Sequence, residues 1–326
     1  MPFSYIMAKF LFSNVIGAFV FDEKHRIIDE VLFNNIEQYS NKGVHEEKLK
    51  EKHKDAISPD EESLHHILLA FKDKKYFSDF SARNIKLTKL SLKESVKKDL
   101  LIMQAISAIG DIDKAVNLLV KRLREWYSCY NPEASYAFEG HEKFVNLITK
   151  KTKSQLLKEL NVDETEAIGA DMAEKDVSPI MLLASQLNNF YKLRKHYEDY
   201  LKELEKEACP NFMEVAGVTI AAKLIAHAGS MERLIKMPAS TIQILGAEKA
   251  LFRHMRNKQR NLPPKYGLIH EHQLIQKSEK GMQAKAARAL ADKLSIAIKI
   301  DYFKGKFIGD KLKKGLEAKF KISYGE

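Results

Sequence analysis

Signals for export, membrane insertion and disulfide bonding are missing from this sequence of 326 residues. No stretch of uninterrupted apolar residues reaches the roughly 18 that a membrane-spanning helix needs. The apolar start, MPFSYIMAKFLFSNVIGAFVFDEK, has no basic region and is interrupted by Lys9 and Asn14, so it resembles neither a signal peptide nor a membrane span. Only Cys129 and Cys209 are present, which fits a reducing compartment, and we interpret both as packing residues. We therefore expect a soluble, cytoplasmic protein.

Motifs of common enzyme classes are also missing. The sequence has no glycine-rich phosphate loop, no nucleophile elbow and no metalloprotease helix. The nearest approach to a metal site is His270-Glu271-His272, but no further ligand stands at a suitable spacing, and we predict no metal centre. We accordingly predict no catalytic residues and no cofactor in this chain.

Basic charge is present in excess and is concentrated in one part of the chain. There are 54 Lys and Arg against 44 Asp and Glu, a net charge of +10. Residues 210–326 hold 22 cations and 10 anions, whereas residues 1–209 hold 32 cations and 34 anions. Such asymmetry favours a polyanionic partner, either nucleic acid or an anionic membrane. A merely basic, solvated surface is the alternative.

The most basic run, GAEKALFRHMRNKQRNLPPKYG, covers residues 246–267 and has no carboxylate after Glu248. Within it, the apolar triplet Ala250-Leu251-Phe252 is surrounded by cations. Cations attract phosphates whatever the base sequence, and apolar or aromatic groups stack on exposed bases or cap a duplex end. A helix starting near Ala247 would add free N–H groups. The alternatives are core burial for Leu251 and Phe252, and a solvated helix face for three further cations: Lys285, Arg288 and Lys299.

The first 90 residues favour a small α+β domain. Residues 10–21 and 26–33 are rich in Val, Ile and Phe, and we predict that they form two strands of an antiparallel hairpin. HHILLAFK and the region near Phe77–Phe80 are candidates for further strands of the same sheet. The charged stretch 41–62 predicts an exposed helix or loop.

Two long amphipathic helices are predicted in residues 91–209. The first carries apolar residues every three or four positions, at Ile102, Ile106, Ile109, Ile112, Val116, Leu119, Leu123, Trp126 and Tyr130. The second follows Pro179, with Ile180, Leu183, Leu187, Phe190, Tyr197, Leu201 and Leu204. Both end near proline, at Pro132 and Pro210. They predict an antiparallel, coiled-coil-like arm; an ordinary helical bundle is the alternative.

Residues 210–326 predict an all-α domain. AGVTIAAKLIAHAG has helical spacing and stops at Gly229, and Ser230 is a candidate N-cap for the next helix. GMQAKAARALADKLSIAIKIDYF and KLKKGLEAKFKI are further amphipathic runs. The fold class predicted for the whole chain is therefore mostly α, with a small amino-terminal α+β domain, a helical arm and an all-α carboxy-terminal domain.

The segment from Asn211 to about Ile322 resembles the Nop domain. The matching runs are GVTIAAKLIAHAGSMERLIKMPASTIQILGAEKALFRH, PPKYGLIH and KAARALADKLSIAIKIDYF, and GAEKALFRH with KMPAS upstream is the most specific. LFSNVIGAFVFDE, RLREWYS and AIGADMAEKD extend the likeness over the rest of the chain. Together they resemble the archaeal Nop-family scaffold of box C/D ribonucleoproteins, which is similar to the eukaryotic nucleolar Nop proteins. Residues 1–6 precede the usual start of the family, which would fall at Met7, and RNKQRNLPPK is longer and more basic than the family pattern.

This resemblance implies a non-catalytic scaffold that directs 2′-O-methylation of RNA. The amino-terminal domain would dock fibrillarin, the methyltransferase that holds S-adenosylmethionine. The long helices would form a homodimer through a coiled coil. The Nop domain would bind a box C/D guide RNA at its kink-turn, together with the small ribosomal-protein-like subunit that sits on it. No membrane contact is implied.

The resemblance also implies site residues, which we take over by motif. The implied RNA-binding residues are Lys236, Gly246, Ala247, Glu248, Lys249, Arg253, His254, Lys265, Lys285, Arg288 and Lys299. The implied duplex-capping loop is Ala250, Leu251, Phe252 and Arg253. The residues expected to mediate dimerisation are Leu183, Leu187, Phe190, Tyr197, Leu201 and Leu204.

Two other classes of function are weighed against the scaffold. FMEVAGVTIAAKLIAHAGSMERLIKM looks somewhat like a helix-hairpin-helix, which would make the chain a DNA-binding protein or a nuclease accessory subunit. That motif wants a second glycine two residues after Gly217, where this chain has Thr219. A stand-alone methyltransferase is disfavoured because no glycine-rich cofactor loop follows a strand.

Overall fold

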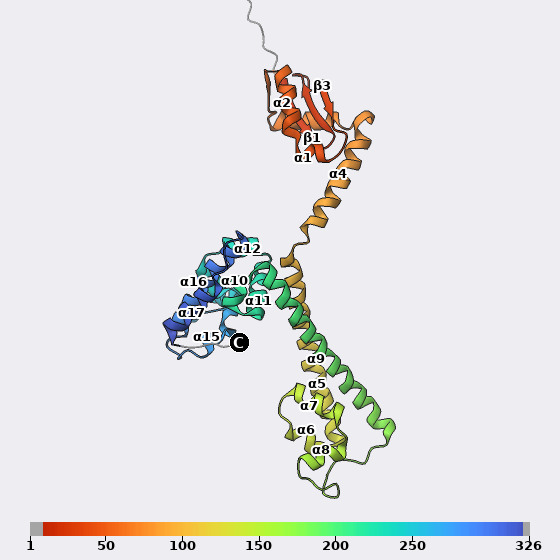
Figure 1. The fold of residues 1–326 in the computed structure, drawn as a ribbon, viewed down its shortest axis with the longest axis vertical. Helices are drawn as coiled ribbons and strands as arrows, with labels where there is room; N and C mark the ends of the chain where they lie inside the picture. Colours follow the sequence, from red (N-terminus) through yellow and green to blue (C-terminus); the bar gives the residue numbers. More distant parts are fainter. Residues whose placement is uncertain (1–8, 322–326) are drawn as a thin grey trace, which may run out of the picture. The chain divides into compact units, whose positions relative to one another are not determined.

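The structure is a computed structural model that describes residues 9–321, so the expected start at Met7 lies outside the described residues. The chain divides into two compact units, one ending at Val96 and the other beginning at Lys97 (Figure 1). The predicted domain 210–326 and all but the first six residues of the predicted domain 91–209 lie in the second unit. Among the described residues, no helix has both the length and the apolar character needed to cross a membrane.

The first unit is built on a sheet with strand order β3-β2-β1-β4. Its strands are β1 (Lys9–Asn14), β2 (Gly17–Phe21), β3 (Ile27–Leu32) and β4 (Ala56–Ile57). The single strand predicted over residues 10–21 is wrong, because β1 and β2 already form a hairpin with a two-residue turn. The Asn14 side chain closes this turn by accepting the Ile16 N–H at 2.9 Å. A Cβ on Gly17 would lie 2.5 Å from the carbonyl oxygen of Val31, so β2 and β3 approach closely only with glycine there.

Helices cover this sheet where further strands were predicted. They are α1 (Glu37–Ser40), α2 (Lys42–Lys52), α3 (Glu61–Ala70) and α4 (Lys74–Ser95). HHILLAFK and Phe77–Phe80 thus lie in or next to α3 and α4, and their assignment to the sheet is wrong. Asp60 and Asp73 cap the two helices by accepting backbone N–H groups at 2.8 and 2.9 Å, which favours helix at both places.

In the second unit, the predicted antiparallel arm is formed by α5 (Lys98–Tyr130) and α9 (Glu174–Ala208) (Figure 1). Ile102 and Ile106 at the start of α5 share a core with Leu201 near the end of α9, whereas Leu123 shares a core with Ile180 near its start. The two helices therefore run in opposite directions. At 1.5 Å per residue each is roughly 50 Å long.

Short helices pack against the far end of the arm. They are α6 (Pro132–Ala137), α7 (His141–Lys150) and α8 (Lys153–Glu159). Arg124 of α5 holds the connection between the first two, because its guanidinium donates to the carbonyl oxygens of Ser135, Phe138 and Gly140. Cys129 is exposed here, so its interpretation as a packing residue is wrong, whereas Cys209 is buried.

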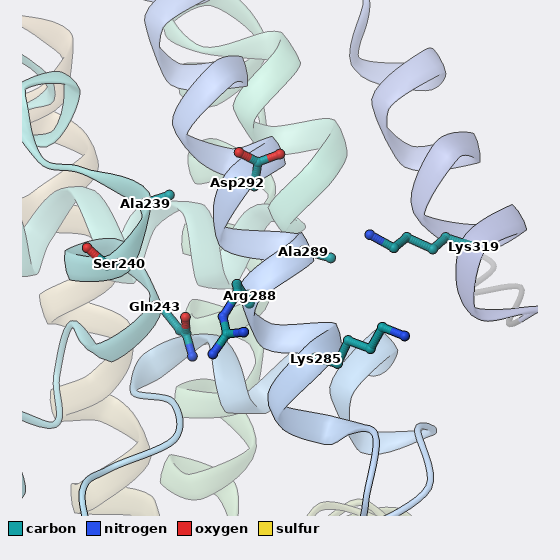
Figure 2. Close-up of a pocket in the computed structure, with 8 residues that line it drawn as sticks. All are labelled: Ala239, Ser240, Gln243, Lys285, Arg288, Ala289, Asp292 and Lys319. Carbon is teal, nitrogen blue, oxygen red and sulfur yellow. The ribbon is translucent and has the colours of Figure 1, made fainter.

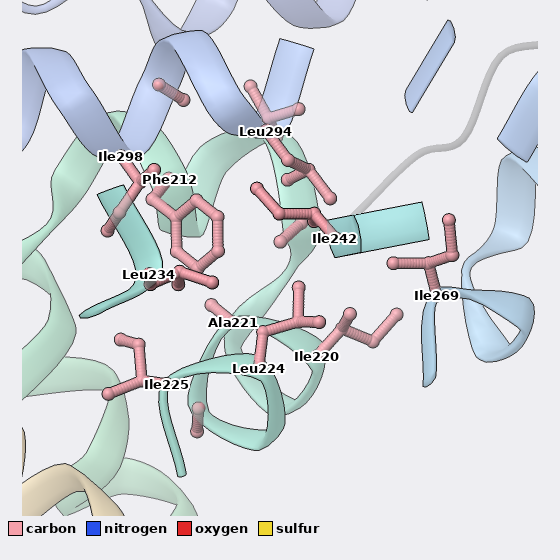
Figure 3. Close-up of a cluster of buried hydrophobic side chains, with 14 of the residues drawn as sticks. Phe212, Ile220, Ala221, Leu224, Ile225, Leu234, Ile242, Ile269, Leu294 and Ile298 are labelled. Atoms are coloured by element: carbon pink, nitrogen blue, oxygen red, sulfur yellow. The ribbon is translucent and has the colours of Figure 1, made fainter. Parts of the chain in front are cut away.

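The carboxy-terminal helices surround a core of Phe212, Leu224, Leu234, Ile242, Leu294 and Ile298 (Figure 3). They are α10 (Pro210–Ala216), α11 (Val218–Ala228), α12 (Met231–Lys236), α13 (Ala239–Ile244), α14 (Glu248–Arg256), the 3₁₀-helix η1 (Leu268–Glu271), α15 (Gln273–Gln276), α16 (Gln283–Tyr302) and α17 (Gly309–Phe320). Gly229 ends α11 in the left-handed region, with φ 84°, and the Ser230 side chain caps α12, as predicted.

The apolar stripe of α9 is buried within the chain itself. Leu187, Leu201 and Leu204 are at most 8% exposed, and Leu201 and Leu204 belong to the same core as Phe212. Leu183, Phe190 and Tyr197 pack against the core around Leu187. The assignment of the three buried leucines to dimerisation is wrong, because α5 and the carboxy-terminal helices already cover them. This shared core also explains why the arm and the carboxy-terminal helices form one unit.

Candidate nucleic-acid interface

Helix α16 supplies the central part of the candidate interface. Its inner side is buried, with Ala287, Leu290 and Leu294 essentially inaccessible to solvent. Its outer side exposes Lys285, Arg288 and Lys299. Arg288 and Lys299 are separated by eleven residues, about three turns, and therefore lie on one face. Within residues 9–321, none of these three cations forms an ion pair. A solvated helix face, the alternative for these three cations, has the same exposure, so their contact with RNA stays a prediction.

A cavity of about 520 Å³ opens beside Arg288 (Figure 2). Its lining comes from α13, α16 and α17: Ala239, Ser240, Gln243, Lys285, Arg288, Ala289, Asp292 and Lys319. In Figure 2 the Arg288 guanidinium points toward the side chain of Gln243, and Lys319 extends from α17 toward α16. Asp292, the one carboxylate of this lining, lies 3.8 Å from Lys293. Three cations and one already paired carboxylate make this hollow suitable for an anion.

Gln243 brings the PPKYG segment to the same cavity. Its side-chain amide donates to the carbonyl oxygen of Lys265 at 2.6 Å, and its own carbonyl oxygen accepts the Gly267 N–H at 2.8 Å. A Cβ on Gly267 would lie 1.9 Å from the carbonyl oxygen of Leu245, so this close backbone approach requires glycine. Gln243 thus holds the backbone of Lys265 beside the cavity that Lys285 and Arg288 border, although these lysines are 20 residues apart in sequence.

The turn before α14 depends on Gly246 and Glu248. Gly246 has φ 88°, and a Cβ there would lie 2.6 Å from Cγ of Leu268. The Glu248 carboxylate accepts the Gly246 N–H at 2.7 Å and lies 2.8 Å from Nε2 of His227. Burial opposes ionisation of Glu248, but these hydrogen bonds hold its pKa below the ordinary value. The Glu248 carboxylate therefore shapes this turn, and its expected contact with RNA stays a prediction.

Helix α14 displays its apolar residues instead of burying them. None of its residues is buried, and Phe252 is 60% exposed. Core burial, the alternative for Phe252, is excluded, whereas Ala250 and Leu251 are half-buried. Lys249 and Arg253 are exposed on the same helix. An exposed aromatic ring between cations fits the expected duplex-capping role, which stays a prediction.

The basic loop 256–265 is folded back onto α14 by His254 and Asn261. Nδ1 of His254 donates to the carbonyl oxygen of Asn261 at 2.6 Å. The Asn261 side chain in turn donates to the carbonyl oxygens of Arg253 and Asn257, at 3.2 and 3.3 Å. His254, predicted to bind RNA, therefore has a structural function at this nitrogen. The sequence analysis missed this folded loop, although Asn257 and Asn261 four residues apart were a signal for it.

The remaining predicted contacts lie at the other end of α16. Lys236 is 2.7 Å from Glu232, and this hydrogen bond raises the pKa of Lys236. The electrostatic interaction with Tyr302 also raises the pKa of Lys236. Lys236 therefore lies near the carboxy-terminal end of α16. Lys299 lies at the same end. Lys285 and Arg288 thus lie beside the cavity that Gln243 lines, whereas Lys236 and Lys299 lie near Tyr302 at the other end of α16.

The His270-Glu271-His272 sequence is not arranged as a metal site. His272 is buried, its Nε2 donates to the carbonyl oxygen of Val215 at 3.0 Å and its Nδ1 accepts the Leu274 N–H at 3.1 Å. Burial lowers the pKa of His272 to about 4. In the part of the chain that the structure describes, no group of three or more His, Cys, Asp or Glu residues is placed to hold a metal ion.

Comparison with known proteins identifies the family. The Nop family model, described as "snoRNA binding domain, fibrillarin", matches residues 108–322, about two thirds of the chain. The chain belongs to the Nop family. An uncharacterised NOP5 family protein of Methanocaldococcus jannaschii is 45% identical over 241 residues, which are 69% of this chain and 58% of that protein. Nucleolar protein 58 of Sclerotinia sclerotiorum is 38% identical over 219 residues, 63% of this chain and 38% of that protein.

This Nop-family chain therefore spans less than two thirds of the length of these curated relatives. Among solved structures, that of a fibrillarin/Nop5p complex covers 95% of this chain and 98% of its own chain, at 23% identity and a TM-score of 0.43. Family membership lends no support to the helix-hairpin-helix alternative.

Proposed function

We propose that this chain is a non-catalytic scaffold of a box C/D ribonucleoprotein that directs 2′-O-methylation of RNA. It bridges fibrillarin to a kink-turn RNA that carries a small ribosomal-protein-like subunit. Membership in a family whose description names both snoRNA binding and fibrillarin supports this proposal. In this assignment fibrillarin holds the methyl donor, S-adenosylmethionine. This chain positions fibrillarin and the RNA and takes no part in the methyl transfer.

The observation that carries the RNA contact is the unpaired cationic group around the cavity on α16. Arg288, Lys285 and Lys319 border one hollow, and no carboxylate in the described residues pairs with Arg288 or Lys285. A guanidinium donates two parallel hydrogen bonds to a phosphate, which an ammonium does not. Arg288 is therefore assigned as the main phosphate contact, with Lys265 and Lys249 flanking it.

Fibrillarin docking is assigned to the first unit and self-association to the arm. Since the apolar stripe of α9 is already covered, a second copy would meet outward-facing side chains of the arm. Leu118 and Leu182 are 72% and 63% exposed and supply apolar surface for such a contact. The expected cytoplasmic localisation stays a prediction.

Replacing Arg288 with Ala tests the RNA contact. Gel-shift titrations would use the full chain and a kink-turn RNA already loaded with the ribosomal-protein-like subunit, at several salt concentrations. We expect Kd to rise by roughly 5- to 100-fold, the equivalent of about 1–3 kcal/mol, and the salt slope to fall by about one unit. Arg122→Ala is the matched control, because Arg122 is a 72% exposed arginine on the arm.

An unchanged Kd and salt slope for Arg288→Ala would remove Arg288 from the interface. Tighter binding to duplex DNA than to the loaded kink-turn RNA would overturn the scaffold as a whole. Binding of S-adenosylmethionine by the isolated chain, measured by calorimetry, would contradict the non-catalytic assignment.

A further inference from the structure

The segment Tyr302–Phe307, with sequence YFKGKF, connects α16 to α17 and exposes large aromatic rings. Tyr302, Phe303 and Phe307 are 38%, 72% and 52% exposed. Three exposed aromatic side chains within six residues are unusual, because such rings normally supply core burial. An exposed apolar cluster of this kind indicates a contact that is completed by a partner.

The segment has a defined backbone, so the exposure is built into the fold. After α16 the Gly305 N–H donates to the carbonyl oxygen of Ile300 at 2.8 Å, and the Lys304 N–H donates to that of Asp301 at 3.1 Å. Lys304 adopts the left-handed region, with φ 55°, where glycine or asparagine is usual. At the other end, the Ile308 N–H donates to the Asn211 side chain at 2.6 Å.

Positive charge alternates with the rings. Lys304 and Lys306 lie between Phe303 and Phe307, and both ammonium groups are without an ion pair in residues 9–321. Lys299 precedes Phe303 by about one helical turn and is likewise unpaired among the described residues. The neighbouring Asp301 does not neutralise them, because its carboxylate accepts the N–H groups of Asn211 and Phe212.

We propose that residues 302–307 bind unpaired RNA, with bases stacked on Phe303 and Phe307 and phosphates held by Lys304 and Lys306. Aromatic rings stack on any base whose face is free, and in a duplex those faces are already covered. A protein partner fits less well, because protein interfaces are depleted in lysine. This inference deepens the proposed function. It rests on the proposed function only for the identity of the partner, RNA.

The location supports an RNA strand that continues along α16. Phe303 lies fifteen residues beyond Arg288, which is about 22 Å along a helix axis. Lys299 and Lys236 lie at the same end as the aromatic segment. An RNA strand that is bound by its phosphates at Arg288 and continues along α16 would thus reach Phe303.

The test is fluorescence anisotropy of the full chain with two labelled probes, a 12-nucleotide oligouridine and a blunt 12-base-pair RNA duplex. Replacing Phe303 and Phe307 together with Ala should weaken oligouridine binding at least tenfold and change duplex binding less than twofold. The Phe303→Tyr, Phe307→Tyr variant should retain affinity, since stacking is preserved. Tyr136→Ala is the control, because Tyr136 is an 80% exposed ring on α6. The Phe307 ring lies near Gly309, where an added Cβ would be 3.1 Å from it, so the single variant Phe303→Ala tests stacking without disturbing that packing.

Replacing Lys304 and Lys306 with Ala should reduce the slope of log K against log salt concentration for oligouridine by about 1.4. Each lysine that neutralises a phosphate of a single strand contributes roughly 0.7 to that slope. The site is disproved if the wild type does not bind oligouridine, or if the double Ala variant binds it as tightly as Tyr136→Ala does. Loss of a protein subunit from the double variant, with RNA affinity unchanged, would reassign the segment to a protein contact and equally overturn it.

The two proposals fail separately. If Arg288→Ala weakens binding to the loaded kink-turn RNA while the double Ala variant leaves oligouridine binding unchanged, the single-strand site is wrong and the proposed function stands. The reverse pattern would retain the single-strand site and reject the kink-turn contact.

Discussion

Glu205 is the residue whose chemistry fits its surroundings least. It lies on α9 fully buried, and neither oxygen of its carboxyl group has a hydrogen-bond partner. Burial raises its pKa to about 9, so the group is protonated and neutral at pH 7. Burial and the neighbouring Glu205 and Asp301 also raise the pKa of the Cys209 thiol. The junction of the arm with the carboxy-terminal helices thus contains acidic groups that are held uncharged.

This burial makes stability depend on pH. The folded state keeps the Glu205 proton that the unfolded chain releases above about pH 4.5, so this contribution is complete below pH 4.5 and is lost as pH rises toward 9. Between pH 5 and 8 the wild type should lose up to about 4 kcal/mol of unfolding free energy through this group. Glu205→Gln should remove that loss. Urea titrations followed by circular dichroism at pH 5, 6.5 and 8 measure it.

The difference between the wild type and Glu205→Gln isolates this group, because the other titrating residues, such as His272, are common to both. Glu203→Gln is the control, since Glu203 is an exposed carboxylate on the same helix. If the unfolding free energies of the wild type and Glu205→Gln changed equally with pH, Glu205 would not be buried in solution as described.

At the scale of elements, α14 depends on one turn more than on its own packing. It has no buried residue, and it is held at its start by Gly246, Glu248 and His227. Gly246→Ala would combine a left-handed φ with a Cβ that meets Leu268. We expect it to lower the unfolding free energy by about 1–3 kcal/mol and to speed hydrogen exchange in α14. Mass-spectrometric exchange and thermal melting measure both effects.

Gly315→Ala is the matched control for Gly246→Ala. Gly315 lies within α17, and a Cβ added there meets no atom within 4 Å. This substitution should be neutral or slightly stabilising, because alanine favours helix. Slow exchange in α14 of Gly246→Ala would show that the helix is held by contacts other than this turn.

Whole elements were predictable to different degrees. The three-to-four spacing in α5 and α9 depends only on which residues face the core, and it correctly predicted two long helices; the amphipathic run GMQAKAARALADKLSIAIKIDYF likewise contains the helix α16. The hairpin of β1 and β2 was missed because its turn residues, Val15 and Ile16, are apolar and buried. In a continuous apolar run, a turn of the chain can be recognised only from its turn-forming residues, which here are Asn14 and Gly17. The strands expected at HHILLAFK failed because the caps from Asp60 and Asp73 were overlooked.

At the scale of the whole molecule, the two units have separate cores. The hydrophobic clusters around Phe19 and Ala18 contain only residues before Lys97, and those around Leu187 and Phe212 contain only residues after Val96. Leu187→Lys places a charge in the fully buried core around Leu187 in the second unit. We expect calorimetry to show a lowered transition for residues 97–321 and an unchanged transition for the first unit.

Leu182→Lys is the control for this change, since Leu182 is 63% exposed on the same helix. It should leave both transitions in place, and if the outer face of the arm carries the self-association, sedimentation should show a weakened dimer. A Leu187→Lys variant that is a stable monomer with unaltered melting would restore the buried stripe as the dimer contact.

The sequence by itself determined the features that depend on neighbours along the chain. These are the long helices, the ending of α11 at Gly229, the concentration of cations after residue 210 and, through the GAEKALFRH motif, the family. Only the tertiary structure decided which charges remain available and which apolar residues remain exposed. Gln243 holds the backbone of Lys265 beside the cavity that Arg288 borders, Asp301 holds the start of α10 from 90 residues away, and Phe252 stays in solvent while Leu187 does not. The reason is physical: local spacing sets which side a residue faces, but its partner is chosen by packing between elements that the sequence places far apart.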